Sequence, residues 1–92
     1  MATEAQVEEA LRIAVKERDG FCFKMTGYRG IPDRLILLPN GKAGFCEVKK
    51  QGIEPRLSQL AMHHSLRKRG YKVFVLDNVE LVDTILEDIW SS

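Results

Sequence analysis

The sequence predicts an α/β fold in which a small mixed β-sheet is flanked by helices. Helical patterns and short apolar runs alternate along the 92 residues in the order α-β-β-β-α-β-α. An Asn40-Gly41 pair lies between the second and third apolar runs, and this dipeptide is a strong hairpin signal. A helical pattern then separates the third run from the fourth, and a crossover of this kind indicates a mixed sheet with helices on its faces.

The first helix is expected to begin after Thr3. Gln6 stands three residues later and completes the spacing of a capping box. Gly20 ends the helix. Apolar residues recur at helical spacing between these limits and define one buried face, made of Val7, Ala10, Leu11, Ala14 and Val15.

Three strands follow, over residues 21–25 (FCFKM), 33–38 (DRLILL) and 43–50 (AGFCEVKK). The loop between the first two holds two glycines and a proline, and the turn PNGK joins the second to the third.

The register of this hairpin decides where Asp33 lies. A two-residue loop at Asn40-Gly41 pairs positions whose numbers sum to 81 and sets Asp33 opposite Val48. Glu47 and Lys49 then flank that point on one face. Asp33 joins their face only if the register slips by one, through an odd loop or a bulge, for which Gly44 is a candidate; alternatively, Pro32 holds Asp33 off the strand path.

The second half of the chain predicts a helix over 56–69, stopped by Gly70, and a strand over 71–76 rich in β-branched and aromatic residues. Asp77 or Asn78 caps the last helix. Its apolar positions form a belt wider than one sheet face needs, comprising Leu81, Val82, Ile85, Leu86, Ile89 and Trp90.

Length and composition predict a single folded domain over residues 1–92. The hydrophobic share of 45% is too high for a disordered chain. No run approaches the roughly 20 apolar residues that span a bilayer, and the N-terminus lacks the pattern of a signal peptide, so we expect a cytoplasmic protein without a membrane partner. Cys22 and Cys46 have no metal-binding spacing and are expected to be reduced core residues.

Charge is segregated along the chain although the net charge is only +1. Residues 1–20 carry a net −2, residues 21–72 a net +8 and residues 73–92 a net −5. Such segregation can place a positive surface on a near-neutral protein, whereas the alternative is two solvated acidic helices around an ordinary middle.

Asp33, Glu47 and Lys49 are expected to lie close together at one end of the hairpin. Two neighbouring carboxylates repel each other, and one takes a proton unless a cation lies between them. A hard divalent ion such as Mg²⁺ suits oxygen ligands, and a lysine beside it can polarise water or neutralise charge on a phosphate. The pattern therefore suits phosphodiester hydrolysis; the alternative is a surface cluster of salt bridges.

The order of these residues resembles a known signature. Gly30-Ile31-Pro32-Asp33, a hairpin and then Glu47-Val48-Lys49 match the PD…(D/E)xK pattern of the PD-(D/E)XK nuclease superfamily, which has a restriction-endonuclease-like fold. Within it the chain resembles, over almost its whole length, a stand-alone virus-type replication-repair nuclease (VRR-NUC) domain. A helix bearing Gln59 and the segment Gly70–Val73 follow at the expected distances.

The resemblance implies a role for each matching position. Asp33, Glu47 and the backbone carbonyl of Val48 would bind the metal, and Lys49 would orient or activate the attacking water. Gln59 would support the site, although the Ser/Thr-x-x-Gln spacing of the family is disturbed because Ser58 directly precedes it. Glu4 would be the carboxylate of the first helix, with Glu8 as its alternative.

The adjacent histidines His63 and His64 point in different directions on a helix and cannot share a metal. His64 falls on the stripe of Leu57 and Leu60, so we expect it to be the partly buried one. Basic side chains and one tyrosine are expected to contact phosphates: Lys50, Arg56, Arg67, Arg69, Arg29 and Tyr28. For the run 67–69 the alternative role is favourable placement of cations at a helix C-terminus.

Taken together, the resemblance implies a Mg²⁺-dependent DNA endonuclease, with Mn²⁺ able to substitute and no small-molecule cofactor. Its substrate would be branched DNA, a Holliday junction or flap, bound by a homodimer in a bacterial cytoplasm. Such a protein is viral or bacterial and acts in DNA repair or as a Holliday junction resolvase. The alternative is a non-catalytic DNA-binding or scaffold domain that retained the fold.

Overall fold

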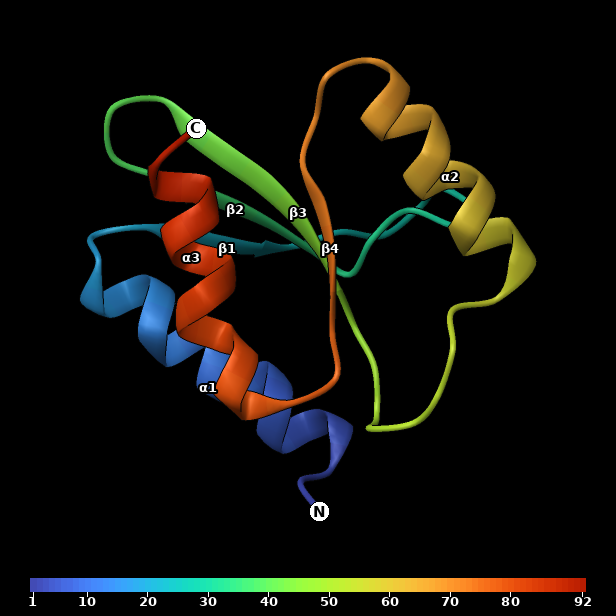
Figure 1. Ribbon diagram of the computed structural model, residues 1–92, viewed down its shortest axis with the longest axis horizontal. Helices are drawn as coiled ribbons and strands as arrows, with labels where there is room; N and C mark the ends of the chain where they lie inside the picture. The colour runs from blue at the N-terminus through green and yellow to red at the C-terminus, as the bar shows by residue number, and fades with distance from the viewer.

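The computed structural model describes residues 1–92 as a four-stranded mixed sheet with three α-helices (Figure 1). The order of elements is the predicted one. The elements are α1 (Glu4–Glu17), β1 (Phe21–Lys24), β2 (Arg34–Leu38), β3 (Lys42–Val48), α2 (Leu57–Lys68), β4 (Val73–Leu76), a 3₁₀ turn η1 (Val79–Leu81) and α3 (Val82–Trp90).

The sheet order is β1-β2-β3-β4, so the strands lie in the order of the sequence. β1 with β2 and β2 with β3 are antiparallel, and β3 with β4 is parallel. The parallel pair is possible because α2 carries the chain back along the sheet before β4 begins.

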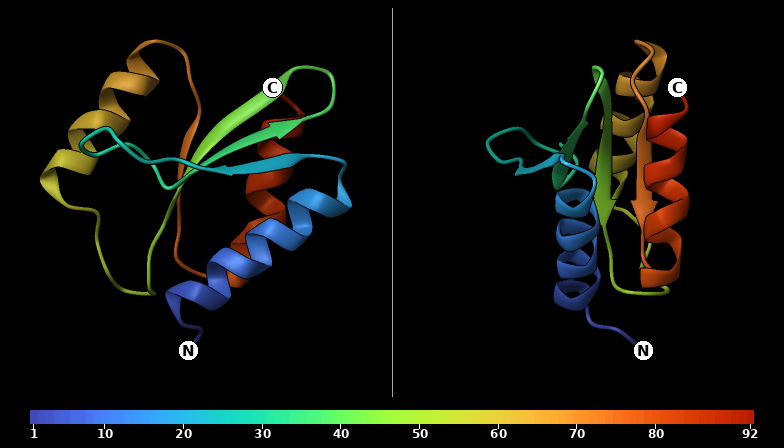
Figure 2. Two further views of the ribbon diagram at one scale, coloured as in Figure 1. Left: turned by 180° about the vertical axis from the view of Figure 1, so that it is seen from behind. Right: turned by 90° about the vertical axis from the view of Figure 1, so that its left-hand side faces the viewer.

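The helices divide between the two faces of the sheet. Figure 1 shows α1 and α3 on one side and α2 on the other, and the turned views of Figure 2 agree. Side chains alternate along β3, so Cys46 and Val48 enter the core under α1 and α3 while Glu47 points towards α2. The apolar core therefore lies on one face, and the other face is available for a polar site.

The helix ends follow the expected signals. The Thr3 hydroxyl accepts a hydrogen bond from the Gln6 N–H, and the Gln6 side chain accepts one from the Thr3 N–H, which completes the predicted capping box. Gly70 has a φ of 91° directly after α2, in the left-handed region that glycine adopts without strain. Asn78 caps η1, through which the chain enters α3.

The hairpin loop corrects the predicted register. The loop has three residues, 39–41, and the strands pair positions whose numbers sum to 80, as in Arg34 with Cys46. Asn40 and Gly41 both have positive φ, as the turn signal requires, but Pro39 is also part of the loop. Extending the pairing by one residue sets Asp33 opposite Glu47. The change of register by one residue therefore comes from the three-residue loop and not from a bulge.

Gly44 has a different role from the bulge that the sequence suggested. It pairs regularly with Ile36, and a Cβ built at this position would lie 2.9 Å from two carbon atoms of Ile89. The absent side chain lets α3 pack directly on β3.

Four residues of the apolar belt around α3 are used inside the molecule, because Val82, Ile85, Leu86 and Ile89 are buried against α1 and the sheet. The other two, Leu81 and Trp90, are 41% and 47% exposed, so part of the belt remains as apolar surface, as the sequence suggested. None of the helices is both long and apolar enough to cross a membrane. Both cysteines are free, as expected.

Exposed aromatic residues also lie on the sheet, on the same face as α2. Phe21 and Phe23 of β1 are 62% and 48% exposed and stack with their ring centres 5.4 Å apart. They pair with Leu37 and Leu35 of β2, which are only half-buried. α2 does not cover this part of the sheet, so an apolar surface remains open to solvent.

Candidate functional site

Asp33 and Glu47 meet where β2 begins and β3 ends. One carboxylate oxygen of Asp33 accepts a hydrogen bond of 2.8 Å from the backbone N–H of Val48, the residue after Glu47. The backbone carbonyl of Asp33 accepts a hydrogen bond from the N–H of Met25, which fixes the chain just before β2 begins. These bonds place the two carboxyl groups side by side, close enough to hydrogen-bond when one is protonated.

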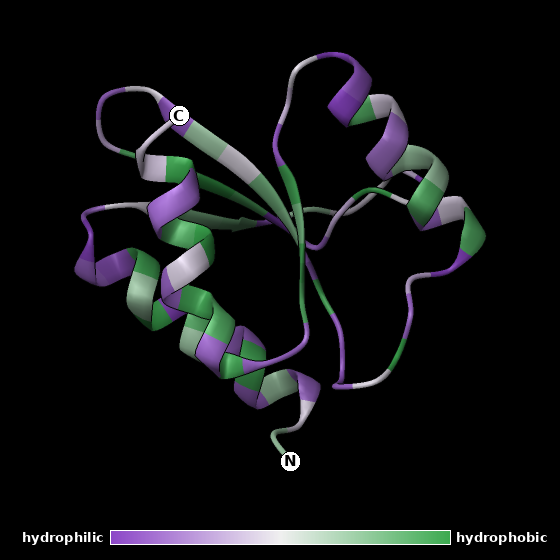
Figure 3. Ribbon diagram, in the orientation of Figure 1, coloured by the Kyte–Doolittle hydropathy of each residue, from purple (hydrophilic) through white to green (hydrophobic).

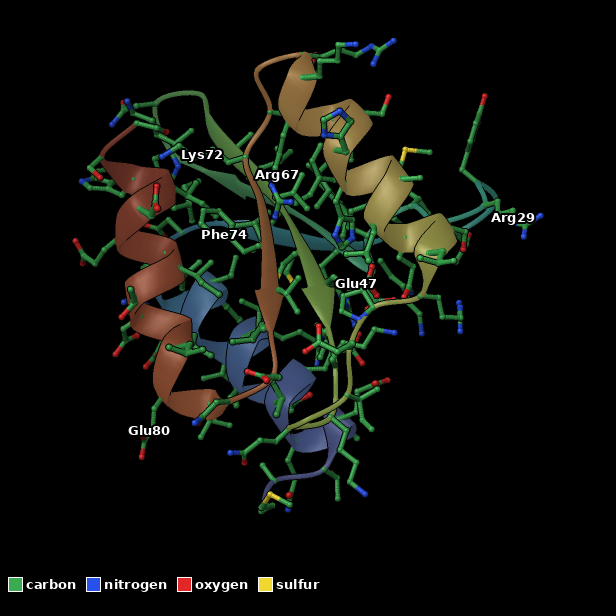
Figure 4. The ribbon with its side chains drawn as sticks, turned by 45° about the vertical axis from the view of Figure 1, so that its right-hand side comes forward. Arg29, Glu47, Arg67, Lys72, Phe74 and Glu80 are labelled. Carbon is green, nitrogen blue, oxygen red and sulfur yellow. The ribbon has the colours of Figure 1, made fainter.

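Glu47 is a buried acid held by α2. Its side chain is 1% exposed. The Gln59 amide donates to one carboxylate oxygen at 3.1 Å, and Nε2 of His63 lies 3.2 Å from the other. Figure 4 shows Glu47 between β3 and α2, on the side of the sheet that α2 covers. Each oxygen of this carboxylate thus has one partner on the helix.

Gln59 joins the start of α2 to the site. Its side-chain oxygen accepts a hydrogen bond of 2.8 Å from the N–H of Arg56, the residue before the helix. Arg56 stands where a capping box would have Ser or Thr, and its side chain offers no acceptor. The hydrogen bond from the helix backbone to the side chain of the capping residue is therefore lost. The other hydrogen bond of the box, from the Arg56 N–H to the Gln59 side chain, is kept and positions Gln59.

The buried side of α2 is polar, which reverses one sequence prediction. The two buried residues of this helix are Gln59 and His63, whereas Leu57 is 84% exposed and Leu60 is also exposed. His64 is exposed, so the expectation that it would be the buried histidine is wrong. The apolar stripe misled the prediction because this helix faces a carboxylate; Figure 3 shows hydrophobic colour on the first turns of α2. The available signal was the i, i+4 spacing of Gln59 and His63.

The pKa of Glu47 reflects its surroundings. Burial and, to a lesser extent, the neighbouring Asp33 raise this pKa from an ordinary 4.5 to about 8, although Lys49 and Arg56 act in the opposite direction. Burial also lowers the pKa of His63, which Arg67 and Lys49 lower further. These surroundings therefore favour a Glu47 that is protonated or bound to a cation, beside a neutral His63 imidazole.

Lys49 follows Glu47 by two residues and lies on the same face of β3. It is buried, and its N–H donates to the carbonyl of Leu76 at 2.9 Å, which continues the pairing of β3 with β4. Its ammonium acts on the pKa of both Glu47 and His63, so it belongs to the same electrostatic environment.

The two candidate glutamates of α1 differ in their surroundings. Glu4 is exposed and makes no side-chain hydrogen bond or ion pair. Glu8 accepts a hydrogen bond of 2.9 Å from Nε of Arg34, the residue after Asp33. Arg34 also donates to the carbonyl of Cys22, so this partly buried ion pair ties α1 to β1 and β2.

The residues present fit a hard divalent cation. Two carboxylates share one small volume, and neither forms a salt bridge with a lysine or arginine. No third Asp, Glu, His or Cys side chain completes a cluster with them. The remaining ligands would therefore come from a backbone carbonyl, water and phosphate oxygens, which is the coordination that Mg²⁺ accepts in phosphoryl-transfer sites.

A cavity of about 660 Å³ opens beside Asp33. It lies between the loop before β2 and the first turn of α2, and both Asp33 and Gln59 line it. In Figure 1 this loop extends from the sheet towards α2, and the right-hand view of Figure 2 shows its tip projecting away from the rest of the molecule. Gly30 makes the approach possible, because a Cβ there would lie 2.3 Å from the carbonyl oxygen of Ser58 and its φ is 79°.

The predicted phosphate-binding residues fall into two groups. Tyr28, Arg29 and Arg56 line the cavity, and Arg29 projects outwards from the loop in Figure 4. Lys50 is exposed at the end of β3, beside the carboxylates in sequence. The second group lies at the other end of α2, where Arg67 donates to the carbonyl of Val73 and Arg69 donates to Ser65.

Charge divides between the two sides of the molecule. α1 and α3 carry most of the acidic residues and lie on one face of the sheet, while α2 has no acid and lies on the other. The segregation seen along the sequence thus becomes a basic side that contains the carboxylate pair and an acidic side opposite to it.

Comparisons with known proteins find similar chains, among them a phage protein and a solved domain. "Putative nuclease p44" of Acyrthosiphon pisum secondary endosymbiont phage 1 is 41% identical over 80 residues, which are 85% of this chain and 86% of the relative. A solved structure described as a VRR_NUC domain superposes with a TM-score of 0.86 at 34% identity, covering 94% of this chain and 97% of the other. No family model matches the sequence.

Proposed function

The chain belongs to the VRR-NUC family of nucleases, and from this premise we propose that it is a metal-dependent endonuclease that hydrolyses phosphodiester bonds of DNA. The observation that carries the proposal is the closeness of Asp33 to the buried Glu47, whose pKa is raised by burial and, to a lesser extent, by the neighbouring carboxyl group. A divalent cation would relieve the repulsion between the two carboxylates, and Mg²⁺ suits oxygen ligands with several retained waters.

Each residue of the site has a separate task in this proposal. Asp33 and Glu47 hold the cation, together with the backbone carbonyl of Val48, and Gln59 fixes the Glu47 carboxylate from α2. Lys49 orients the attacking water and offsets the negative charge that develops on the phosphate. When bound, Mg²⁺ polarises the phosphate and lowers the pKa of water. Glu8 of α1, held by Arg34, supports the chain beside Asp33, and Glu4 remains the second candidate for a carboxylate of this helix.

DNA would approach from the α2 side. The cavity beside Asp33 is lined by Arg29 and Arg56, and Lys50 is exposed nearby, so the phosphates of a strand would meet cations before they reach the carboxylates. Tyr28 is 76% exposed at the same cavity and can stack on a base. Arg67 and Arg69 would extend the basic surface along α2. The phage origin of the similar nuclease suggests that this one acts in a bacterial cytoplasm.

We also propose that the protein is a homodimer that prefers branched DNA, such as a junction or flap. The surface that favours a dimer is the open sheet face, where Phe21 and Phe23 stack beside half-buried leucines of β2. The belt around α3 offers less, because only Leu81 and Trp90 of it are exposed. Two copies would bring two basic surfaces and two sites into one particle, which suits DNA whose backbones diverge from one point.

Cleavage is expected in Mg²⁺ or Mn²⁺ and is expected to be absent in EDTA or Ca²⁺. Ca²⁺ binds oxygen sites with looser geometry and more ligands, so it should support DNA binding without aligning the water. The measurement is a panel of labelled four-way junction, flap, fork, duplex and single-stranded DNA, each with every ion. Branched substrates are expected to be cut faster than duplex of equal length.

Equal cleavage in EDTA would exclude the metal mechanism. Equal rates on junction, flap and duplex would remove the preference for branched DNA and leave a general nuclease. Tight DNA binding without cleavage in any ion would favour the non-catalytic alternative.

Phe23→Glu is expected to convert the dimer into a monomer. The side chain is 48% exposed in the chain, so a carboxylate is tolerated there in the monomer but would be desolvated in an interface. Analytical ultracentrifugation of the wild-type protein and the variant measures the effect. Leu57→Glu, which changes an exposed apolar residue of α2, is the matched control and should leave the dimer intact. A dimeric Phe23→Glu variant would place the interface elsewhere, and a monomeric wild-type protein would exclude the dimer.

A further inference from the structure

His63 and Gln59 hold opposite oxygens of one carboxylate. They are four residues apart and lie on the same side of α2, so both side chains reach Glu47 from the same direction. His63 and Glu47 are each no more than 1% exposed. With both oxygens held, the Glu47 carboxylate cannot rotate about its last bond without breaking at least one hydrogen bond.

The geometry selects one form of the imidazole. Nε2 of His63 faces the carboxylate, and Nδ1 is buried without a hydrogen-bond partner. A hydrogen on Nδ1 would be an unpaired buried donor, whereas a bare Nδ1 is an unpaired acceptor, which folded proteins tolerate better. The favoured tautomer is therefore neutral with its hydrogen on Nε2, where it donates to Glu47.

Filling the core does not explain a histidine at this position. Burying a polar ring with one unpaired nitrogen costs free energy, and a leucine would fill a similar volume without that cost. The same helix has leucines at 57 and 60, yet these are exposed while His63 is buried. The helix thus presents its polar residues, and not its apolar ones, to Glu47.

We propose that His63 is a positioning residue that, together with Gln59, fixes the Glu47 carboxylate in the orientation needed to hold a divalent cation. This inference rests on the proposed metal-dependent function. Residues that hydrogen-bond a metal ligand from behind determine its orientation, and their removal typically costs about 10–100-fold in metal affinity or activity. His63 does not touch the substrate in this proposal and acts only through Glu47.

The test measures metal binding directly, by isothermal titration of Mn²⁺ into the metal-free protein without DNA. His63→Leu removes the hydrogen bond and is expected to weaken Mn²⁺ binding by about 10–100-fold. His63→Gln retains an amide donor of similar reach and should recover most of the affinity. His64→Leu, at the exposed neighbouring position, is the matched control and should bind as the wild-type protein does.

The outcomes separate this role from the proposed function. Unchanged Mn²⁺ binding by His63→Leu, with a wild-type protein that binds and cleaves, would overturn the role of His63 alone. Equal weakening in His63→Gln and His63→Leu would also overturn it, because shape and not the hydrogen bond would then matter. A wild-type protein that binds no metal would overturn the proposed function and, with it, any need for a positioning residue.

A second measurement uses the wild-type protein, so it holds even if His63→Leu does not fold. Nitrogen NMR of the histidine rings should find His63 neutral with its hydrogen on Nε2. Addition of Mg²⁺ should shift the His63 signals and leave those of exposed His64 unchanged. A His63 ring protonated on Nδ1, or one that does not respond to Mg²⁺ at a concentration that supports cleavage, would overturn the proposal.

Discussion

Glu47→Gln is expected to reduce DNA cleavage by more than about 100-fold while the protein remains folded. Groups that support a metal ligand cost up to about that factor when they are removed, so loss of the ligand itself should cost more. Glutamine has nearly the same shape and keeps an oxygen that can accept a hydrogen bond from α2, but it lacks the charge that would hold a cation. Asp33→Asn and Lys49→Met apply the same logic to the other two residues, and both are expected to abolish cleavage.

Single-turnover cleavage rates at saturating protein, together with thermal unfolding, separate chemistry from folding. Glu54→Gln removes an acid from the exposed loop after β3 and should cleave at the wild-type rate. Wild-type cleavage by Glu47→Gln would exclude the assignment of the site. Unfolding of Glu47→Gln would instead favour a structural cluster of charges, the alternative that the sequence left open.

The position of Asp33 illustrates what local sequence can and cannot determine. The motif, the two strands and the turn residues were all predictable because each depends on a few neighbouring residues. The register depended on whether Pro39 belonged to the strand or to the loop, and a change of one residue turns a side chain to the other face of a sheet. A loop with an odd number of residues was one of the alternatives, but no feature of the sequence favoured it over the two-residue loop.

The orientation of α2 could not be predicted from hydrophobic periodicity. That rule assumes that apolar side chains face the protein, whereas this helix turns Gln59 and His63 inwards to meet a buried glutamate. The pattern fails here because the partner surface is a buried carboxylate and not an apolar core. Disagreements between local pattern and fold are expected at functional sites, which is the role that we propose for this carboxylate. The capping box of α1 and the core face of that helix, which serve structure alone, were predicted correctly.

The metal-free protein is expected to lose stability relative to Glu47→Gln as the pH rises from 5 to 8. Folding raises the pKa of Glu47 from 4.5 to about 8, so between these values the folded protein binds a proton that the unfolded chain has released. The free energy of unfolding therefore falls with rising pH in this interval, and since one pKa unit corresponds to about 1.4 kcal/mol the loss should be of the order of a few kcal/mol. The variant has no such group and retains His63, whose lowered pKa acts in the opposite sense at the acid end. The difference between the two proteins in the free energy of unfolding therefore isolates the contribution of Glu47.

Denaturant unfolding of both proteins in EDTA at several pH values measures this difference, and repeating it in Mg²⁺ tests its origin. The cation and the proton compete for the same carboxylates, so Mg²⁺ should stabilise the wild-type protein more at pH 8 than at pH 5. It should have little effect on Glu47→Gln at either pH. A stability difference that does not change with pH would mean that Glu47 is not held in its protonated form by burial and by Asp33. Equal stabilisation of both proteins by Mg²⁺ would mean that the ion binds away from this pair, and the carboxylates would then lose their place as the metal site.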